Sequence, residues 1–162
     1  MGEPTVLQLR GGRPEDVDLV FRWANDPTTR QVSFNRSPIS YDTHLRWYAE
    51  QLERSDRNVF IAWDVNETPV ALVRLDRGEC QHRCIVSINV APGERGRGIG
   101  TAALKAATPV AMTLGFRTID AYIRPTNGAS IKAFVKAGYS LAQRDAASSE
   151  ALRYELDVTE PS

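Results

Sequence analysis

The sequence is poor in cysteine, since Cys80 and Cys84 are the only two among 162 residues. Two cysteines cannot build the disulfide framework that holds many small secreted domains together. A zinc site normally needs a second pair of ligands, and none accompanies the segment 80–84. We therefore predict a metal-free protein of a reducing compartment, the cytoplasm.

Long hydrophobic runs are also missing. No apolar stretch approaches the ~18 residues that a membrane-spanning helix requires, and residues 1–16 contain no apolar segment typical of a secretory signal. A membrane is therefore not an expected partner. The length suits a single domain with its own core, which we expect to cover residues 1–162.

An excess of charge of either sign is absent, because 20 Lys and Arg balance 20 Asp and Glu. A protein that coats nucleic acid needs a broad basic face, so nucleic acid is not an expected partner. Lysine itself is scarce, and the only examples are Lys105, Lys132 and Lys136. The preference for arginine is a modest indication of anion recognition, since its planar guanidinium suits phosphates and carboxylates.

Hydrophobic periodicity predicts a sheet combined with helices. Strands are predicted at residues 6–10, 59–65, 70–75, 84–90, 118–123, 139–144 and 152–158. Helices are predicted to begin at Pro14, at Ser40, near Gly98 and at Ser130, with a short helical turn at 28–34. Strands with helices on both sides along the sequence indicate the α/β class with a mixed sheet.

The helices carry predictions of their own. Apolar spacing predicts core-facing stripes of Val17, Val20, Phe21 and Ala24 in the first helix and of Leu45, Tyr48, Ala49 and Leu52 in the second. The third helix should reach about Leu114, but it contains Pro109. Because proline has no N–H to donate, we expect that helix to kink or end near Thr108.

A glycine-rich turn joins the strand that ends near Val90 to the helix that follows. Its residues are Arg95, Gly96, Arg97, Gly98, Ile99, Gly100 and Thr101. Glycines let backbone N–H groups come close to a ligand, and a helix start adds unpaired donors with a partial positive charge. The two arginines add full charges, so the pattern predicts a site for a phosphate or pyrophosphate.

Three ligands can be compared for this turn. A nucleotide triphosphate on a P-loop requires a lysine and a Ser or Thr that are missing here. Residues 98–103 fit a dinucleotide fingerprint, with Asp120 about 20 residues further on, but the strands before the turn form a hairpin rather than βαβ units. The third ligand is the pyrophosphate of coenzyme A.

Two motifs favour coenzyme A. Residues 95–100, Arg-Gly-Arg-Gly-Ile-Gly, follow a strand ending Val90-Ala91-Pro92 and resemble the R/Q-x-x-G-x-G/A signature of the GNAT acetyltransferase superfamily. Residues 127–139 resemble its second motif, N-x-x-S/A-I-x-x-hydrophobic-x-K-x-G-F/Y. The resemblance covers essentially the whole chain. It implies a GNAT-like domain with a mostly antiparallel mixed sheet flanked by helices, and acetyl-CoA as the co-substrate.

The resemblance also implies roles for individual residues. A backbone N–H near Val90 would hold the thioester carbonyl, Ile88 would also contact the cofactor, and the turn at 95–101 would hold the pyrophosphate. Asn127, together with Ser130, would contact the pantetheine arm or its surroundings.

Phe134 would pack near the same arm, and it departs from the family pattern. Many members carry a tyrosine at this position, whose hydroxyl protonates the departing thiolate. Phe134 cannot do so, which leaves a water or Tyr139 as the substitute. The loss is tolerable, since a thiol pKa near 8.5 makes the thiolate an acceptable leaving group.

The amino-terminal part resembles one branch of the superfamily, whose members acetylate nucleotide-linked 4-amino sugars of the pseudaminic acid pathway. The resemblance rests on residues 21–27 with Arg30 and on residues 39–40 and 44–47; ribosomal-protein N-terminal acetyltransferases share a looser version. A nucleotide-sugar needs a cation for its diphosphate and a ring for its base. The candidate acceptor contacts are Arg22, Asn25, Arg30 and Trp47.

The group that takes the proton from the amine has three candidates. His44 has a reference pKa near 6.5, which suits proton uptake at neutral pH, and it can face a cleft or simply the solvent. Ser87 and Asn89 share one face of their strand, from which they can direct a water toward the amine.

Together these features predict an acetyl-CoA dependent N-acetyltransferase that acts on the primary amine of a small molecule, with a nucleotide-linked amino sugar preferred. Two alternatives stay open: acetylation of a protein or peptide N-terminus, and a coenzyme A binding module without catalysis. Phe134 and the lack of an obvious carboxylate base motivate the second alternative. The sequence does not fix the oligomeric state, and a homodimer stays open.

Overall fold

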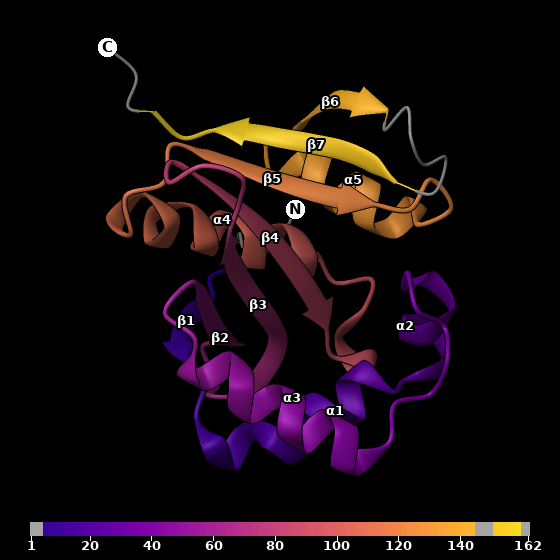
Figure 1. Cartoon of the computed structure of the whole chain (residues 1–162). Coiled ribbons are helices and arrows are strands. Elements are labelled where there is room, and N and C mark those ends of the chain that lie inside the picture. Colours follow the sequence, from indigo (N-terminus) through magenta and orange to yellow (C-terminus); the bar gives the residue numbers. More distant parts are fainter. Residues whose placement is uncertain (1–4, 145–150, 160–162) are drawn as a thin grey trace.

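The computed structural model describes residues 5–144 and 151–159, which form one sheet with helices on both faces (Figure 1). Within these residues the sheet has seven strands in the order β1-β2-β3-β4-β5-β7-β6. They are β1 (Gln8–Gly11), β2 (Arg57–Trp63), β3 (Pro69–Arg77), β4 (Arg83–Val90), β5 (Thr118–Ile123), β6 (Ser140–Arg144) and β7 (Leu152–Asp157). Only β4 and β5 pair in parallel; the other neighbours are antiparallel. The predicted mixed, mostly antiparallel α/β sheet is confirmed.

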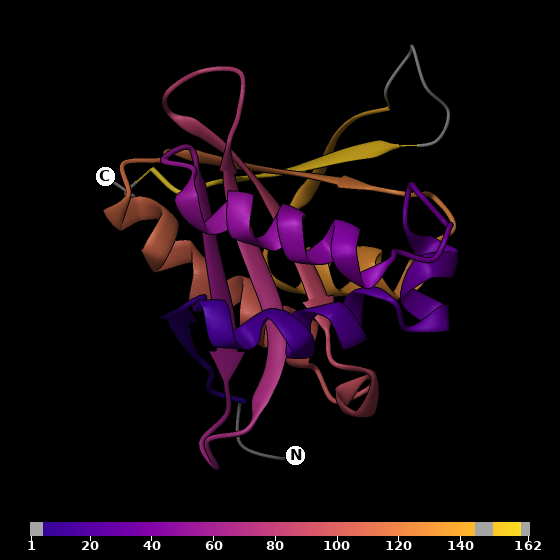
Figure 2. The same cartoon turned by 60° about the horizontal axis from the view of Figure 1, so that its bottom comes forward.

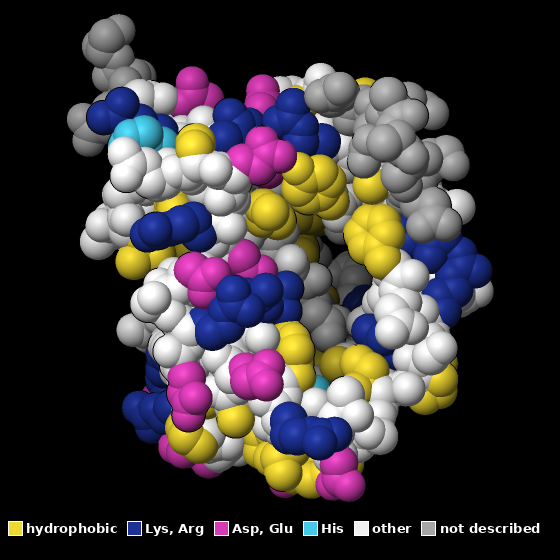
Figure 3. All heavy atoms as spheres, in the orientation of Figure 1, with side chains coloured by type: hydrophobic (Ala, Val, Ile, Leu, Met, Phe, Trp, Pro, Cys, Tyr) yellow, Lys and Arg dark blue, Asp and Glu magenta, His cyan; other side chains and the backbone are white. Residues whose placement is uncertain are grey.

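The helices form two layers. Helices α1 (Val17–Ala24) and α3 (Tyr41–Glu53) pack on one face of the sheet, and α4 (Ile99–Thr113) and α5 (Gly128–Lys136) pack on the other (Figure 2). The short α2 (Pro27–Val32) lies near the end of β4, and the 3₁₀ turns η1 (Pro14–Asp16) and η2 (Pro92–Glu94) complete the order. The surface is hollowed where β4 and β5 separate (Figure 3). Among the described helices, none is both long and apolar enough to cross a bilayer.

The strand predictions agree with the structure to within two residues at every end, and the largest local difference has a clear cause. β2 ends at Trp63 because Asp64 begins a turn. Its carboxylate accepts the N–H groups of Asn66 at 2.8 Å and Thr68 at 3.0 Å. Val65, which the pattern assigned to the strand, is 79% exposed in this turn.

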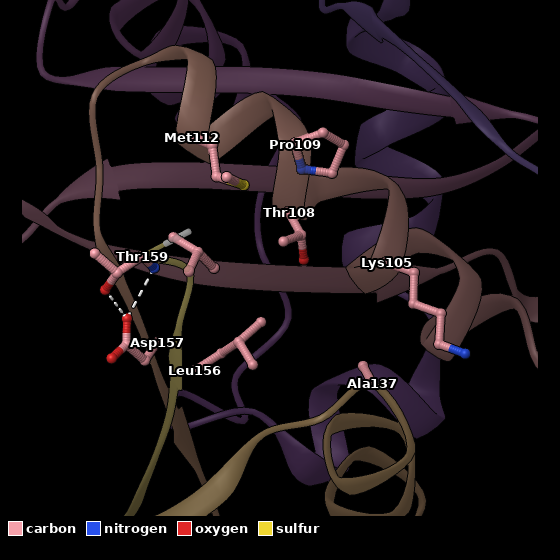
Figure 4. Close-up of a pocket in the computed structure, with 9 residues that line it drawn as sticks. Lys105, Thr108, Pro109, Met112, Ala137, Leu156, Asp157 and Thr159 are labelled. Carbon is pink, nitrogen blue, oxygen red and sulfur yellow. Dashed lines mark hydrogen bonds between the residues drawn. The ribbon is translucent and has the colours of Figure 1, made fainter. Parts of the chain in front are cut away.

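Helix α4 continues to Thr113, so Pro109 does not end it near Thr108; of the two expected effects, a kink or an end, the end is wrong. Pro109 lies on the exposed side of α4, where it lines a pocket together with Met112 and Leu156 of β7 (Figure 4). The opposite side of the helix is fully buried at Ala103, Ala107 and Ala111. Burial of that stripe outweighs the one backbone hydrogen bond that proline removes.

Helix α3 buries Tyr48 as predicted, but its buried face is rotated away from the rest of the predicted stripe. His44, Tyr48 and Gln51 are buried, whereas Leu45 and Ala49 are exposed. Helix α1 is rotated in a similar way, because it buries Trp23 rather than Phe21, which is half-buried.

His44 is the reason why the apolar pattern of α3 failed. The expectation that it faces a cleft or solvent is wrong, because the residue is 1% exposed. Its Nε2 atom lies 3.1 Å from the carbonyl oxygen of Val17, and this hydrogen bond requires the proton on Nε2. The ring also packs against Phe21 and Trp47. Because this hydrogen bond satisfies the ring N–H of His44, the polar side chain can occupy a core position.

Replacing Pro109 with alanine should raise the free energy of unfolding by about 1–3 kcal/mol, because alanine restores an N–H inside α4. Greater freedom of the unfolded chain offsets part of this gain, by roughly 0.4–1 kcal/mol. Urea unfolding followed by circular dichroism measures the difference. Thr113→Ala, which removes a side-chain bond to the Pro109 carbonyl without changing the backbone, is the control. An unchanged free energy in Pro109→Ala would contradict the prediction.

Burial lowers the pKa of His44 in the folded protein, against smaller opposing effects of the Val17 carbonyl and Asp18. The unfolded chain therefore takes up the proton first as the pH falls. The stability that depends on neutral His44 is complete above the unfolded pKa of about 6.5 and declines as the pH falls through the folded pKa. His44→Gln should flatten the fall in unfolding free energy below about pH 6.5. The exposed His82→Gln should retain it, and equal slopes in the two variants would refute the assignment.

Candidate active site

β4 and β5 diverge along their length, and this divergence opens a gap in the sheet (Figure 1). Their parallel pairing ends at the pair formed by Ile85 and Asp120. β4 nevertheless continues to Val90, which still pairs with Ala71 of β3. The hollow in Figure 3 lies at this place. One edge of an interior strand is therefore left open.

The open edge presents backbone donors. Ala91 donates its N–H to the carbonyl oxygen of Val70, on the side of β3, at 2.8 Å. Because N–H groups alternate in direction along an antiparallel pair, those of Ile88 and Val90 point away from β3 and toward the gap. This is the orientation that holding a carbonyl oxygen requires.

The turn after β4 places glycine where other residues would not fit. Gly96 and Gly98 have φ angles of 78° and 76°, in the left-handed region that costs other residues roughly 1–2 kcal/mol. Gly100 packs closely, since a Cβ atom there would lie 3.3 Å from the Cβ of Ala133 and 3.6 Å from the Cδ1 of Ile88. These glycines allow α4 to begin directly beside the end of β4.

Helix α4 begins with backbone donors that no side chain caps. Gly98 is its N-cap residue and has no side chain to offer, and Ala102 donates to the carbonyl of Gly98 at 3.1 Å. The N–H groups of Ile99, Gly100 and Thr101 thus precede the first intrahelical bond. With the partial positive charge of the helix start, they make a site suited to an anion.

The two arginines of the turn are already paired with carboxylates. Arg95 Nη1 lies 2.8 Å from Asp26 Oδ2, and its Nη2 donates to the hydroxyl of Thr29 at 2.7 Å. Arg97 forms an ion pair with Glu94. Their charges are partly neutralised, so the backbone donors of the turn become more important than the sequence indicated.

Helix α5 brings the second motif next to the turn. Asn127 caps it, because its Oδ1 accepts the N–H of Ser130 at 3.2 Å, and the helix therefore begins at Gly128 rather than at the predicted Ser130. Phe134 is buried and meets Tyr139 edge to face, with ring centroids 4.9 Å apart. The Tyr139 hydroxyl is buried and has no hydrogen-bond partner among the described residues, and burial raises its pKa well above the usual value.

The three candidates for handling the proton of the amine occupy different places. Ser87 and Asn89 lie on the side of β4 that carries α1 and α3, and Ser87 is exposed there. Asn89 is half-buried, and its Oδ1 accepts a hydrogen bond from Thr29 at 3.3 Å. His44 is enclosed between α1 and α3, so its buried ring is not placed to meet an amine at the surface.

Two of the residues predicted to contact the amine substrate, Asn25 and Arg30, form hydrogen bonds within the protein. The amide of Asn25 donates to the carbonyl of Ile39 at 2.6 Å and accepts its N–H at 2.8 Å. Arg30 donates to the carbonyls of Ala24 at 2.7 Å and Asn35 at 2.8 Å. These bonds fix the segment around α2, so neither side chain is placed mainly for a ligand.

The other two acceptor candidates are more accessible. Arg22 is exposed on α1, and Trp47 is half-buried on α3. The guanidinium of Arg74, on β3, lies 5.3 Å from the centre of the Trp47 ring. Arg74 is also the cross-strand partner of Ser87, which places this cation next to the candidate site.

Sequence reasoning missed several contacts of the site. Asp26 and Thr29 contact Arg95, and Arg124, just after β5, donates to the carbonyl of Ser33 at 2.9 Å. Asp26 before a proline is a helix-capping pattern and could have located the start of α2. However, no local sequence pattern indicates that Asp26 and Thr29 contact Arg95, which is far away in the sequence.

Asp120 belongs to an ion-pair network at the closed end of the gap. Arg83 donates to both of its carboxylate oxygens, at 2.9 and 2.7 Å, and Arg153 lies at 3.3 Å. Asp120 is only 5% exposed. A dinucleotide needs this carboxylate available for a ribose hydroxyl, so the network argues against that ligand. Among the described residues, no group of three or more His, Cys, Asp and Glu side chains could hold a metal ion.

Comparisons with known proteins agree with this geometry. Residues 7–140 match the family described as "Acetyltransferase (GNAT) domain". A Bacillus subtilis protein named "Putative phosphinothricin acetyltransferase YwnH" is 27% identical over 139 residues, which make up 83% of this chain and 84% of that protein.

Solved structures share the fold. Spermidine N-acetyltransferase from Vibrio cholerae, in complex with CoA and spermine, has a TM-score of 0.83 at 17% identity and covers 93% of this chain and 95% of its own. The aminoglycoside acetyltransferase AAC(6')-Ib, in complex with acetyl-CoA, has a TM-score of 0.81 at 16% identity and covers 94% and 93%. The family match spans most of the chain, and the protein therefore belongs to the GNAT acetyltransferases.

Proposed function

We propose that the protein transfers the acetyl group of acetyl-CoA directly to the primary amine of a small molecule. The observation that carries this proposal is the gap between β4 and β5. There the N–H groups of Ile88 and Val90 face the same opening that the uncapped start of α4 borders. One opening thus offers donors for a carbonyl and donors for a phosphate.

The shape of the turn fits the co-substrate. Cβ atoms built at Gly96 and Gly98 would meet nothing within 4 Å, so the backbone there is open to a ligand. The start of α4 suits the pyrophosphate. The free edge of β4 suits the amide groups of the pantetheine arm, which can bond to it as an added strand would.

Acetyl-CoA supplies an activated acetyl thioester, and the side chains and backbone of the site do the rest. The N–H groups of Ile88 and Val90 polarise the carbonyl and stabilise the negative charge that develops on its oxygen. The amine nitrogen displaces the sulfur at the carbonyl carbon. Ser87 and Asn89 orient a water that accepts the proton of the amine. Phe134 donates no proton, so the sulfur leaves as a thiolate.

We infer that the acceptor is a nucleotide-linked amino sugar. The resemblance of the amino-terminal segment supports this acceptor, and so does the stack of Arg74 on Trp47 beside Ser87. One guanidinium nitrogen, Nε of Arg74, is buried with no partner in the part of the chain that the structure describes, while Nη2 pairs with Asp76 at 3.2 Å. A cation and an indole together suit the phosphate and base of a nucleotide.

Isothermal titration should show binding of acetyl-CoA at micromolar concentrations and no comparable binding of NADH. Gly98→Ala should weaken acetyl-CoA binding by about tenfold, because the strain of a left-handed alanine, roughly 1–2 kcal/mol, disturbs the donors at the start of α4. Gly93→Ala is the matched control, since its Cβ would meet nothing within 4 Å and its φ is not left-handed. Tight NADH binding without acetyl-CoA binding would overturn the proposal.

A panel of amines mixed with acetyl-CoA should identify the acceptor through thiol release and the mass of the product. The panel consists of a nucleotide-linked 4-amino sugar, phosphinothricin, spermidine, an aminoglycoside and a peptide with a free N-terminus. We expect the amino sugar to show the highest kcat/KM by about tenfold or more, which corresponds to about 1.4 kcal/mol.

Each other result of the panel has a defined meaning. A preference for phosphinothricin or spermidine would replace the acceptor and keep the reaction. A preference for the peptide would favour N-terminal protein acetylation. Binding of acetyl-CoA with no thiol release from any amine would instead favour a module that binds coenzyme A without catalysis.

A further inference from the structure

Helix α2 bridges the two arms of the gap. At its start, Asp26 pairs with Arg95 of the turn that follows β4. At its end, the carbonyl of Ser33 accepts a hydrogen bond from Arg124, which follows β5. Figure 1 shows α2 lying at the open end of the gap, where the ends of β4 and β5 are far apart. One short segment therefore contacts both sides of the candidate site.

Thr29 lies in the middle of a hydrogen-bond chain within this bridge. Its hydroxyl accepts from Arg95 Nη2 at 2.7 Å and donates to Asn89 Oδ1 at 3.3 Å. A hydroxyl has a single hydrogen, so accepting from Arg95 leaves that hydrogen to Asn89. The Asn89 amide oxygen is thereby directed toward Thr29, and its NH₂ group is directed the other way.

The two residues that Thr29 links, Arg95 and Asn89, belong to different parts of the site. Arg95 belongs to the turn that is suited to an anion, and Asn89 lies on β4 between Ile88 and Val90, whose N–H groups face the gap. Arg95 has five N–H donors, and Asp26 and Thr29 engage only some of them. A phosphate at the turn can therefore bind a guanidinium that still holds Thr29.

We propose that Thr29 is a positioning residue. It couples the binding of a phosphate at the turn 95–101 to the orientation of the Asn89 amide on the face of β4 that carries α1 and α3. The inference rests on the proposed function, because the pyrophosphate of coenzyme A is the anion that binds Arg95 and changes the hydrogen bond that Arg95 makes to Thr29. Coenzyme A binding would then change the orientation of the Asn89 side chain, next to which the amine substrate would bind, without contacting that side chain.

The Asn89 side-chain amide can be observed directly by ¹⁵N NMR of the full chain, with its signals identified by their loss in Asn89→Ser. Addition of coenzyme A should shift these signals in the wild type. Thr29→Val and Thr29→Ala both remove the hydroxyl and should abolish the shift. Thr29→Ser keeps the hydroxyl and should restore it. Calorimetry should find coenzyme A affinity within about threefold of the wild type in all three variants, well below the tenfold that 1.4 kcal/mol produces.

Thr28→Val is the matched control, because Thr28 is its exposed neighbour on the same helix and should leave the shift unchanged. Two results would overturn the inference while leaving the proposed function intact. In the first, coenzyme A binds to the wild type but the Asn89 signals do not shift. In the second, the signals shift in Thr29→Val and Thr29→Ala by as much as they do in the wild type. If the wild type binds no coenzyme A in the calorimeter, the proposed function itself fails.

Discussion

The early end of the pairing between β4 and β5 is the constraint on which the site depends. At the closed end the strands are held by Arg83, which bonds Asp120 at 2.9 and 2.7 Å and Glu155 at 2.9 Å. Beyond Ile85, β4 follows β3 alone. Backbone N–H groups inside a sheet are normally paired, and leaving them without partners is costly. The open edge of β4 is therefore a feature that an extended ligand can complete.

Positive and negative charges are paired at the site, as they are balanced in the whole sequence. Three arginines around the gap are matched by acids, in the pairs Arg95–Asp26, Arg97–Glu94 and Arg74–Asp76. A site of this kind does not attract anions through net charge. It selects them through the direction of backbone N–H groups at the open strand edge and at the start of α4, which require a ligand of fixed geometry.

Features that depend on neighbouring residues could be predicted from the sequence. The bounds of β5 were predicted without error, and the glycine turn was recognised because its left-handed positions at Gly96 and Gly98 demand glycine. The fold class and the family followed from such local patterns. The expectation that Pro109 can end α4 was wrong, since a local rule was applied where the burial of the opposite helix face decides the outcome.

Features that depend on distant partners could not be predicted. His44 lies at a core position because the carbonyl of Val17 satisfies its ring, and no periodicity of apolar residues reveals such a bond. Arg30 and Arg95 were assigned to ligands on the basis of their chemistry. The structure engages Arg30 with backbone carbonyls and Arg95 with α2, so these guanidinium groups also organise the protein around the gap.

The arrangement also limits the kind of catalysis that is available. Burial encloses His44, Phe134 has no hydroxyl, and the Tyr139 hydroxyl sits in the core with a raised pKa. None of these three described residues is therefore placed to act as a strong acid or base at the reacting atoms. The remaining contributions are orientation of the reactants and stabilisation of the carbonyl oxygen by fixed N–H donors, which can account for a large part of a rate enhancement. Because a thiolate leaves readily near neutral pH, acetyl transfer is a reaction for which these contributions can suffice.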